Sequence, residues 1–314
     1  MNRTSPAPAA TPTPDAESRG LLTGATAYGI WGMLPLYIAA TAPASAIEIV
    51  IMRIGFSLVF CLILLLILRR FRELRTALGT PRRLGAVGLA ALMIAINWLL
   101  YASSVTTGHV AQASLGYFMN PLVNVLLGVA LLGERLRFAQ WAAVAIAAAA
   151  VLVITLDAGQ VPWIGLGLAF SFGLYGLIKK RAGTTVHPVT AMTAETAVLM
   201  PVFVVGLVWL TTAGLLTTGS HGVGHTAVMA ASGIITAVPL ILFATAARTV
   251  PLSVLGILQY IAPTLQFLLA ITVFGEHMAP GRWVGFGLIW LALVVFTADH
   301  VRHARRQRRL TRLA

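Results

Sequence analysis

Residues 45–68 read SAIEIVIMRIGFSLVFCLILLLIL, an apolar run whose two charged residues are Glu48 and Arg53. A helix needs about 20 consecutive apolar residues to cross a bilayer, so this run predicts a transmembrane helix. The whole chain of 314 residues is 58% hydrophobic and 10% charged, whereas soluble domains are about 45–50% apolar and about 25% charged. This composition predicts a membrane protein and excludes a water-soluble enzyme with a charged surface.

Further apolar segments lie on both sides of this run, with short polar loops between them. In total they cover residues 21–40, 45–68, 84–106, 110–132, 137–156, 162–178, 189–211, 225–247, 251–274 and 281–298. Residues 1–20 are rich in Pro, Ala and Thr and are predicted to be a disordered tail. Residues 299–314 are predicted to form a basic tail. The predicted fold class is an all-α membrane protein with ten transmembrane helices.

The distribution of basic residues predicts how these helices are oriented. With ten spans both termini lie on one side, and twenty of the 22 Lys and Arg residues fall in the tails and loops of that side. Of the remaining two, Arg282 lies on the opposite side and Arg53 lies within a span. The positive-inside rule makes the tail side cytoplasmic. We expect a multi-pass plasma-membrane protein with both termini in the cytoplasm, whose arginine belt contacts anionic lipid rather than nucleic acid.

The two halves of the chain resemble each other. The matched pairs are residues 133–136 (GERL) with 275–278 (GEHM), Pro121 with Pro263, 28–32 (YGIWG) with 172–176 (FGLYG), and Glu48 with Glu195, at offsets of 142 to 147. Four matches in order predict a duplication, with residues 21–156 and 161–298 as two five-helix repeats. Because five is odd, the repeats must enter the membrane from opposite sides, a plan typical of secondary transporters.

Three ionisable residues, Glu48, Arg53 and Glu195, fall inside the predicted spans. A charge at the bilayer centre costs about 2.5–3.5 kcal/mol on insertion scales, so each needs a partner or water. One interpretation is an internal ion pair that only joins helices. The other is a carboxylate that exchanges protons or meets a charged substrate. Glu48 and Arg53 are poorly spaced for a pair on one helix face, which leaves an Arg53–Glu195 pair open.

Polar residues in the third, fourth and ninth segments predict a substrate pathway. In the fourth segment Gln112, Gly116, Asn120 and Asn124 recur every four residues, so this stripe faces either a cavity or a neighbouring helix. The predicted pathway residues are Asn97, Trp98, Tyr101, Gln112, Tyr117, Asn120, Gln259 and Tyr260. Pro121 and Pro263 each remove a backbone donor within a span and are predicted hinges. The alternatives are hydrogen bonding between helices and a packed aromatic core.

No recognisable motif for catalysis or cofactor binding occurs in the sequence. Cys61 is the only cysteine, which excludes a disulfide framework or a thiolate metal cluster. His221 and His225 lie in a Gly-rich loop without a carboxylate or thiol and make a poor metal site. Glu134 and Glu276 each precede a helix and are expected to act as caps. We therefore expect no catalytic residues, no cofactor and no metal.

Three stretches, NWLLYASSVTTGHVAQASLGYFMNPLVNVLLG (97–128), PLSVLGILQYIAPTLQFLLAITVFGE (251–276) and SFGLYGLIKK (171–180), are similar to a known family. The chain resembles the EamA-type permeases of the drug/metabolite transporter superfamily, and among them the RarD subfamily, named for chloramphenicol sensitivity. The resemblance implies ten helices in two inverted repeats, a central cavity, and export of small metabolites or drugs. Met52, Phe56 and Gln112 stand where the subfamily pattern has His, Trp and Glu. Glu48 and Glu195 are therefore the acidic residues that remain for proton coupling.

These observations favour a secondary transporter that moves a small amphipathic molecule by alternating access of the two repeats. The third, fourth, eighth and ninth spans are expected to line its cavity, with Glu48, Arg53 and Glu195 setting charge selectivity or coupling protons. Two alternatives stay open. One is a facilitative uniporter, and the other is a non-transporting scaffold that binds anionic lipid through its cytoplasmic arginines.

Overall fold

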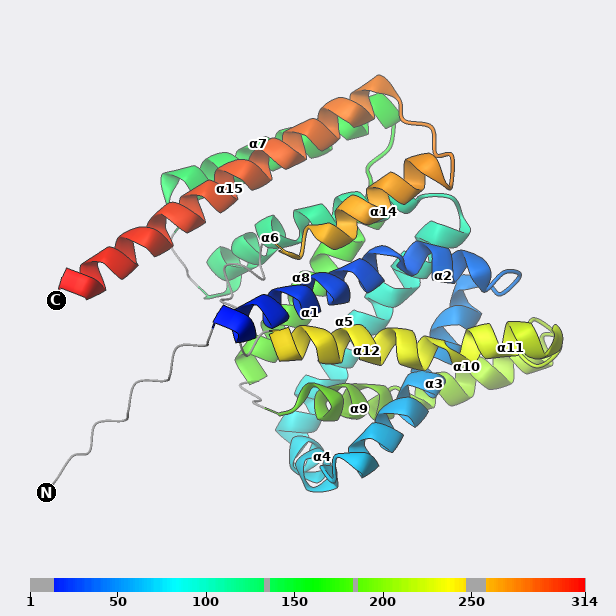
Figure 1. Ribbon diagram of the computed structural model, residues 1–314. Helices are drawn as coiled ribbons and strands as arrows, with labels where there is room; N and C mark the ends of the chain where they lie inside the picture. The colour runs from blue at the N-terminus through cyan, green and yellow to red at the C-terminus, as the bar shows by residue number, and fades with distance from the viewer. Residues whose placement is uncertain (1–13, 133–135, 183–185, 247–257, 314) are drawn as a thin grey trace, which may run out of the picture.

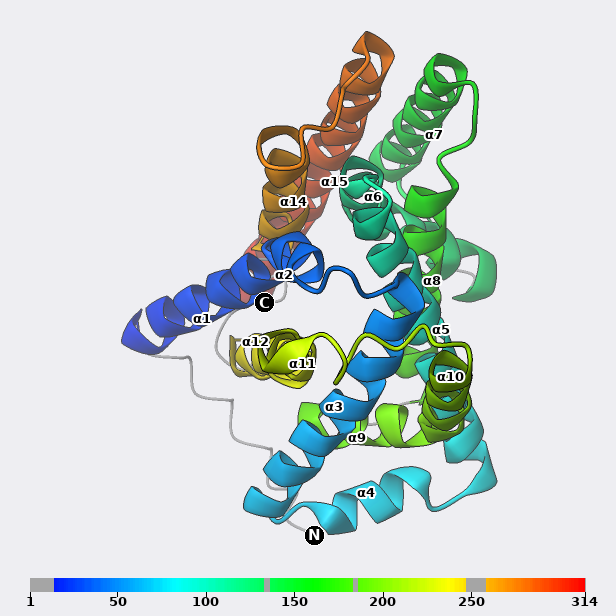
Figure 2. The same cartoon turned by 90° about the vertical axis from the view of Figure 1, so that its right-hand side faces the viewer.

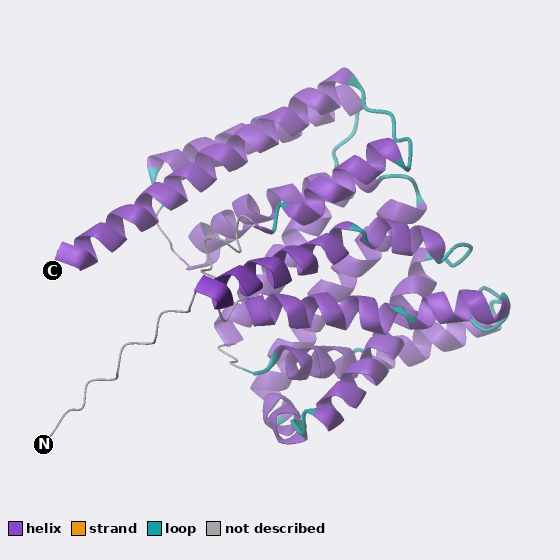
Figure 3. Cartoon of the chain, viewed as in Figure 1, coloured by secondary structure: helices purple, strands orange, loops and turns teal. Residues whose placement is uncertain are grey.

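The apolar segments fold as helices, because backbone inside a bilayer must satisfy its hydrogen bonds within its own segment. The computed structural model describes residues 14–132, 136–182, 186–246 and 258–313, and there the regular structure is helical (Figure 3). The helices are α1 (Pro14–Gly32), α2 (Leu34–Ala40), α3 (Ala46–Ile67), α4 (Phe71–Leu78), α5 (Pro81–Thr106), α6 (Val110–Leu132), α7 (Phe138–Ala158), α8 (Trp163–Ala182), α9 (Pro188–Val198), α10 (Met200–Thr212), α11 (Gly222–Ala230), α12 (Ser232–Ala246), α14 (Ile261–Thr272) and α15 (Pro280–Leu313). The predicted all-helical class is confirmed.

Many of these helices are long and apolar enough to cross a membrane. Within the described residues, seven stretches qualify alone: Arg19–Ala40, Ala46–Ile67, Pro81–Thr106, Val110–Leu131, Phe138–Ala158, Gly222–Phe243 and Pro280–Asp299. The pair α9 and α10 qualifies as an eighth span, although it is bent by 51°. Trp163–Lys179 and Ile261–Thr272 are shorter apolar helices. The protein is therefore a multi-pass membrane protein.

Two segments predicted as single helices are interrupted in the structure. In the first, α1 ends at Gly32 and α2 begins at Leu34, with Pro35 in its first turn. In the seventh, α9 and α10 meet at Leu199, and Pro201 lies in the first turn of α10. Proline fits the first turn of a helix but clashes in its interior, so each break falls just before a proline.

Helices also form in three segments outside the predicted spans. Helix α1 begins at Pro14, so residues 14–20, predicted to be disordered, are helical; residues 1–13 lie outside the described part. Proline at the start and acidic residues in the first turn favour a helix N-terminus, a signal present in the PDAE of residues 14–17. Helix α4 occupies the predicted loop after α3, and Figure 2 shows it lying across the end of that helix. Helix α15 continues through the predicted basic tail to Leu313.

The helices pack in a set of specific pairs. The main contacts are α1 with α12 and α14, α3 with α5, α9, α10 and α12, α5 with α8 and α9, α6 with α8 and α14, α9 with α12, and α7 with α15. Helices α7 and α15 run side by side along one edge, and the start of α1 lies on the same side of the bundle as the end of α15 (Figure 1). Outward faces are apolar: on α3, Val59, Ile63 and Leu66 are more than half exposed. Such a face suits lipid rather than water.

Candidate functional site

Arg53 lies at the centre of a buried polar and aromatic site. It is on α3, seven residues after the helix begins, and only 8% of it is exposed. Its Nε donates a hydrogen bond to Thr236 Oγ1 of α12 at 3.0 Å. Its guanidinium carbon lies 4.3 Å from the centroid of the Trp98 ring of α5, a cation–π contact. The charge predicted from the sequence is therefore held between three helices.

Three tyrosines surround the guanidinium within electrostatic reach: Tyr37, Tyr101 and Tyr117. The Tyr37 hydroxyl donates to the carbonyl of Val228 at 3.1 Å, and the rings of Tyr101 and Tyr117 are 5.6 Å apart. The set formed by Arg53, Tyr37, Trp98, Tyr101, Tyr117 and Thr236 is called the Arg53 cluster below. It combines one cation, aromatic faces and hydroxyl groups.

Asn97 connects this cluster to α8. The Tyr117 hydroxyl donates to Asn97 Oδ1 at 3.1 Å, and Asn97 Nδ2 donates to the Leu168 carbonyl and to Ser171 Oγ, each at 3.0 Å. The amide thus satisfies its donors on α8 and orients the Tyr117 ring. Four predicted pathway residues, Asn97, Trp98, Tyr101 and Tyr117, are brought together around Arg53.

A cleft lies next to the Arg53 cluster, between α1, α2, α12 and α14. It has a volume of about 420 Å³ and is lined by Thr26, Gly29, Ile30, Met33, Leu34, Tyr37, Ile235 and Leu265. Tyr37 belongs to both the cleft and the cluster, and Ile235 precedes Thr236 in the chain. The cleft therefore places an apolar space beside the charged group.

Glu195 forms its ion pair with Lys179, so the Arg53–Glu195 pair left open by the sequence does not form. Lys179 Nζ lies 2.8 Å from Glu195 Oε1 and donates to the Tyr175 hydroxyl at 2.7 Å, and that hydroxyl donates to Glu195 Oε2 at 3.1 Å. The reason is the direction of the helices: Glu195 on α9 meets α8, whereas Arg53 meets α5 and α12. Lys179 falls at the end of its segment, and sequence reasoning counted it only as a topology signal.

A row of aromatic rings joins the two charged groups. Tyr117 contacts Phe172 at a centroid distance of 6.4 Å, and Phe172 contacts Tyr175 at 6.0 Å. Tyr175 in turn lies under Lys179, whose Nζ is 4.8 Å from its ring centroid. The Arg53 cluster and the Lys179–Glu195 pair are thus linked through side chains of α6 and α8.

Glu48 lies in the first turn of α3, not deep within the span as predicted. Its Oε1 accepts from the backbone N–H groups of Thr217 and Thr218, at 3.0 and 2.8 Å, and from the Thr218 hydroxyl at 2.7 Å. Its Oε2 accepts from the Thr217 hydroxyl at 2.8 Å. Ser45 caps the helix by accepting from the Glu48 N–H. Sequence reasoning missed these threonines, but the Ser45-x-x-Glu48 spacing is a helix-start signal that places Glu48 at an end.

Part of the polar stripe of α6 faces α8. Gly116 comes so close to the backbone of Gly165 that a side chain there would clash, and a side chain on Gly173 would meet Asn124. Between the two alternatives that the sequence left open, a neighbouring helix thus accounts for this part of the stripe. Gln112 is half-buried, whereas Asn120 is buried and its Oδ1 has no hydrogen-bond partner within the described residues.

The two predicted hinge prolines differ in their surroundings. Pro121 lies inside α6, which is one helix over its whole length. Pro263 lies in the first turn of α14, where a missing N–H costs little, and its carbonyl accepts from Ser114 of α6 at 2.9 Å. Gln259 and Tyr260 precede α14, and the Tyr260 ring stacks on Phe118 at 6.4 Å. Tyr260 and Pro263 therefore contact the first half of α6.

Glu276 caps α6, which lies far away in the sequence, and not, as the sequence predicted, the helix that it precedes. Its carboxylate accepts the N–H groups of Val110 and Ala111, the latter at 3.0 Å, at the start of α6. Burial raises the pKa of Glu276 above its usual value, and the two N–H groups only partly offset this. Glu134, its counterpart, lies outside the described residues.

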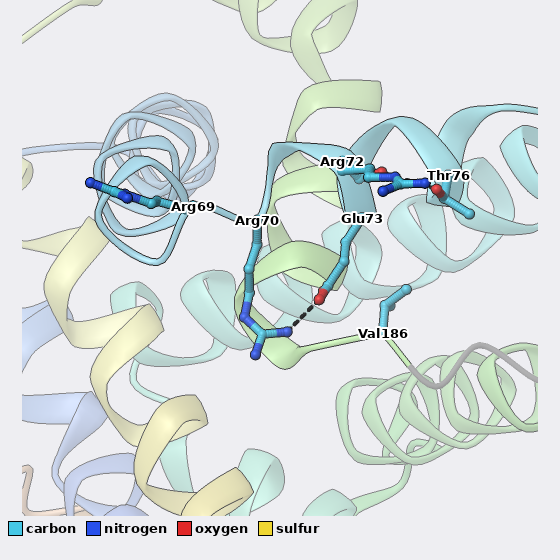
Figure 4. A pocket seen from close by; sticks show the side chains of 6 residues that line it. All are labelled: Arg69, Arg70, Arg72, Glu73, Thr76 and Val186. Atoms are coloured by element: carbon cyan, nitrogen blue, oxygen red, sulfur yellow. Dashed lines mark hydrogen bonds and ion pairs between the residues drawn. The ribbon is translucent and has the colours of Figure 1, made fainter.

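A second cleft, lined mainly by polar and charged side chains, lies beside α4 (Figure 4). It has a volume of about 370 Å³ and is lined by Arg69, Arg70, Arg72, Glu73, Thr76 and Val186. Glu73 pairs with Arg70 and accepts from Thr190 Oγ1. Burial tends to raise the pKa of Glu73, but the Thr190 hydrogen bond and the Arg70 charge outweigh it and hold the pKa below its usual value. Within the described chain, Arg69 and Arg72 have no ion-pair partner.

Apolar helices enclosing a charged, aromatic cluster are typical of polytopic membrane proteins that move small molecules. The model of the EamA-like transporter family matches residues 18–156. Protein RarD of Streptomyces exfoliatus is 50% identical over 92% of this chain and 91% of its own, and Protein RarD of Escherichia coli is 41% identical over 92% and 97%. An uncharacterized transporter of Vibrio cholerae is 38% identical over 95% of this chain and 99% of its own.

The chain belongs to the EamA-like transporter family, in its RarD subfamily, and is a membrane transporter. This confirms the resemblance drawn from the three sequence stretches. A solved crystal structure of a protein with 21% identity superposes with a TM-score of 0.58 over 91% of this chain and 98% of the other. At this identity the match supports the fold alone.

Proposed function

We propose that the protein is a secondary transporter of the bacterial inner membrane that exports a small amphipathic metabolite or drug. The two five-helix repeats would alternate between inward-open and outward-open arrangements around the Arg53 cluster, with Pro121 and Pro263 as hinges. Both ends of the chain would lie in the cytoplasm, in accord with the start of α1 and the end of α15 on one side of the bundle.

The pattern of helix contacts is the observation that carries this proposal. An inverted repeat pairs α1 with α8, α3 with α9 and α10, α5 with α12, α6 with α14, and α7 with α15. When each helix is replaced by its equivalent in the other repeat, the α1–α12 contact becomes α8–α5, the α1–α14 contact becomes α8–α6, and the α3–α12 contact becomes α9–α5. All of these contacts occur. The α6–α14 and α7–α15 contacts convert into themselves. Two halves with equivalent packing can exchange conformations at nearly equal energy, which alternating access requires.

The Arg53 cluster is the proposed substrate contact because it combines both halves. Arg53, Trp98 and Tyr117 come from the first half, and Thr236 comes from the second. Aromatic faces beside a charge and hydroxyl groups suit an amphipathic molecule. Gln112, Asn120, Gln259 and Tyr260 stay predicted pathway residues.

Proton coupling is proposed for Glu195 rather than Glu48. Glu195 pairs with Lys179 and accepts from the Tyr175 hydroxyl, both on α8, so protonation of Glu195 would release Lys179. Glu48 is held by four donors at a helix end. A uniporter, in which the Lys179–Glu195 pair never opens, is the alternative mechanism.

Uptake into proteoliposomes tests this function. We would measure a panel of metabolites and drugs, including amino acids and chloramphenicol, with and without a proton gradient, for the wild type, Glu195→Gln and Glu48→Gln. Gradient-dependent accumulation that is lost in Glu195→Gln and kept in Glu48→Gln is the expected result. Transport that only equilibrates in all three proteins would identify a uniporter, and no flux of any compound would favour a scaffold. Fusion of a folding reporter to Ala314 would test the cytoplasmic location of the C-terminus.

The α4 cleft is proposed to hold the headgroup of an anionic lipid. Arg69 and Arg72 are basic groups without a described ion-pair partner at the bilayer edge, where each such charge attracts anionic lipid by about 1 kcal/mol. Phosphatidylglycerol should raise the thermal stability of the purified protein more than phosphatidylcholine does. The difference should shrink in an Arg69→Gln/Arg72→Gln variant and persist in Arg282→Gln, which alters a basic residue on the opposite side.

A further inference from the structure

We propose that the Arg53 cluster recognises an anionic group, so that the transported molecule carries a carboxylate or similar oxyanion on an aromatic or otherwise apolar body. This inference deepens the proposed function and rests on it. The sequence alone left the sign of the substrate charge open, because one arginine and two glutamates could serve either sign. The partners of these three residues in the structure resolve that choice.

Both glutamates are already neutralised or satisfied by other groups. Glu195 forms its ion pair with Lys179, and Glu48 accepts four hydrogen bonds from Thr217 and Thr218. Neither carboxylate contacts the Arg53 cluster through any ion pair or hydrogen bond of the described chain. A cationic substrate at this cluster would therefore meet a like charge and no counter-charge.

Arg53 is a buried cation without a carboxylate partner among the described residues. The ion pairs found there join Arg70 to Glu73, Arg137 to Asp299, and Lys179 to Glu195. A buried charge is costly unless it is paired and hydrogen-bonded, and one cation–π contact compensates only part of that cost. A substrate anion would supply the missing partner.

The hydrogen-bonding groups of the cluster also fit an oxyanion. Only the Nε of Arg53 has a hydrogen bond within the described residues, to Thr236, so its two terminal nitrogens keep their donors. Within the described part of the chain, the hydroxyls of Tyr101 and Ser57 are buried without a hydrogen-bond partner. Ser57 is one turn from Arg53 on α3. A guanidinium fork with hydroxyl donors beside it is the arrangement that binds a carboxylate.

The apolar part of the ligand follows from the neighbours of the guanidinium. Trp98 presents its ring to it, and the rings of Tyr101 and Tyr117 pack against each other within its electrostatic reach. Tyr37 also lines the cleft of about 420 Å³ between α1, α2, α12 and α14. An oxyanion at Arg53 would thus have apolar surface on more than one side. An inorganic anion would leave that surface unused.

Three probes of one shape test the inference: 3-phenylpropionate, its amide, and 3-phenylpropylamine. Their affinities for the purified protein would be measured by calorimetry. The acid should bind at least about tenfold more tightly than the amide or the amine, the equivalent of one charge-assisted hydrogen bond. Arg53→Gln should abolish this preference, Arg53→Lys should keep part of it, and Arg282→Gln should leave it intact. If Arg53→Gln does not fold, Thr236→Val is the second variant. It removes the hydrogen bond that orients the guanidinium of Arg53 and should reduce the preference for the acid.

The outcomes separate this inference from the proposed function. Weak or no binding of the acid, a preference for the amine, or an acid preference that survives in Arg53→Gln would overturn the inference, even if the same protein transports other compounds. Arg53-dependent binding of the acid without uptake into proteoliposomes would support the anion site and contradict the transport function. Uptake of the acid that is lost in Arg53→Gln would support both.

Discussion

Replacing Glu48 is expected to separate a structural carboxylate from a transport carboxylate. Glu48 is fully buried and joins the start of α3 to the loop after α10 through four donors, two of them backbone N–H groups. In Glu48→Ala, these donors lose their acceptor. Hydrogen bonds to a charged group contribute about 1.5–3 kcal/mol each, but they are not additive where water can enter. We therefore expect a loss of about 3–5 kcal/mol in unfolding free energy, as for a broken buried charge network.

Glu48→Gln should cost much less. A glutamine oxygen in place of Oε1 can still accept from both backbone N–H groups and from the Thr218 hydroxyl, and the amide NH2 can donate to the Thr217 oxygen. Mainly the charge assistance is lost, so the expected cost is about 1–2 kcal/mol. Transport per folded molecule should be unchanged.

Cys61 provides the assay, because it is the only cysteine and is fully buried. A thiol-reactive fluorogenic dye added during heating reports the unfolding midpoint. At roughly 2–4 °C per kcal/mol, the shift usual for chains of about 150–250 residues, the midpoint should fall by roughly 6–20 °C for Glu48→Ala and by roughly 2–8 °C for Glu48→Gln. Asp157→Ala, which removes an exposed carboxylate, is the control. Equal midpoints for Glu48→Ala and the control would refute the reasoning, and loss of proton-dependent transport in well-folded Glu48→Gln would restore Glu48 as a coupling residue.

Further expected outcomes follow from other contacts. Gly116→Ala should cost about 1–3 kcal/mol in thermal unfolding because its side chain would meet the backbone of α8, whereas Gly176→Ala, with open space, should be neutral or stabilising. Since burial raises the pKa of Glu276, the wild type should lose stability relative to Glu276→Gln as pH rises from 4.5 through that raised pKa, and a difference independent of pH would contradict this. Asp299→Asn breaks the partly exposed pair with Arg137 at the contact of α7 and α15 and should lower stability by only about 0.2–1 kcal/mol, also measured by thermal unfolding.

Much of the fold could be predicted because membrane insertion depends on the local composition of each segment. The run at residues 45–68 contains α3 almost to the residue, and the segments at 110–132 and 137–156 contain most of α6 and α7. The breaks at Met33 and Leu199 were missed, although Pro35 and Pro201 signalled them. Helix α4 was missed because it is short and its stability comes from packing on α5 and α9.

The candidate site could be predicted only as a set of residue types. Arg53 was recognisable as a costly charge, and Trp98, Tyr101 and Tyr117 as polar or aromatic residues in spans. Their common location around Arg53 requires α3, α5 and α6 to meet, and no spacing within one segment encodes that. Thr236 carries no signal at all in the sequence, since a threonine in a span usually bonds only its own helix.

By itself, the sequence determined the membrane class, the apolar segments, the family resemblance and the short list of charges that must be compensated. These are local properties, because each helix satisfies its backbone and its lipid contacts within its own segment. Only the tertiary structure decided which charge has which partner: Lys179 for Glu195, two threonines for Glu48, and no carboxylate of the described chain for Arg53. Partner choice depends on which helix faces meet across long sequence separations, and a buried charge is compensated by the group that lies within a few ångströms.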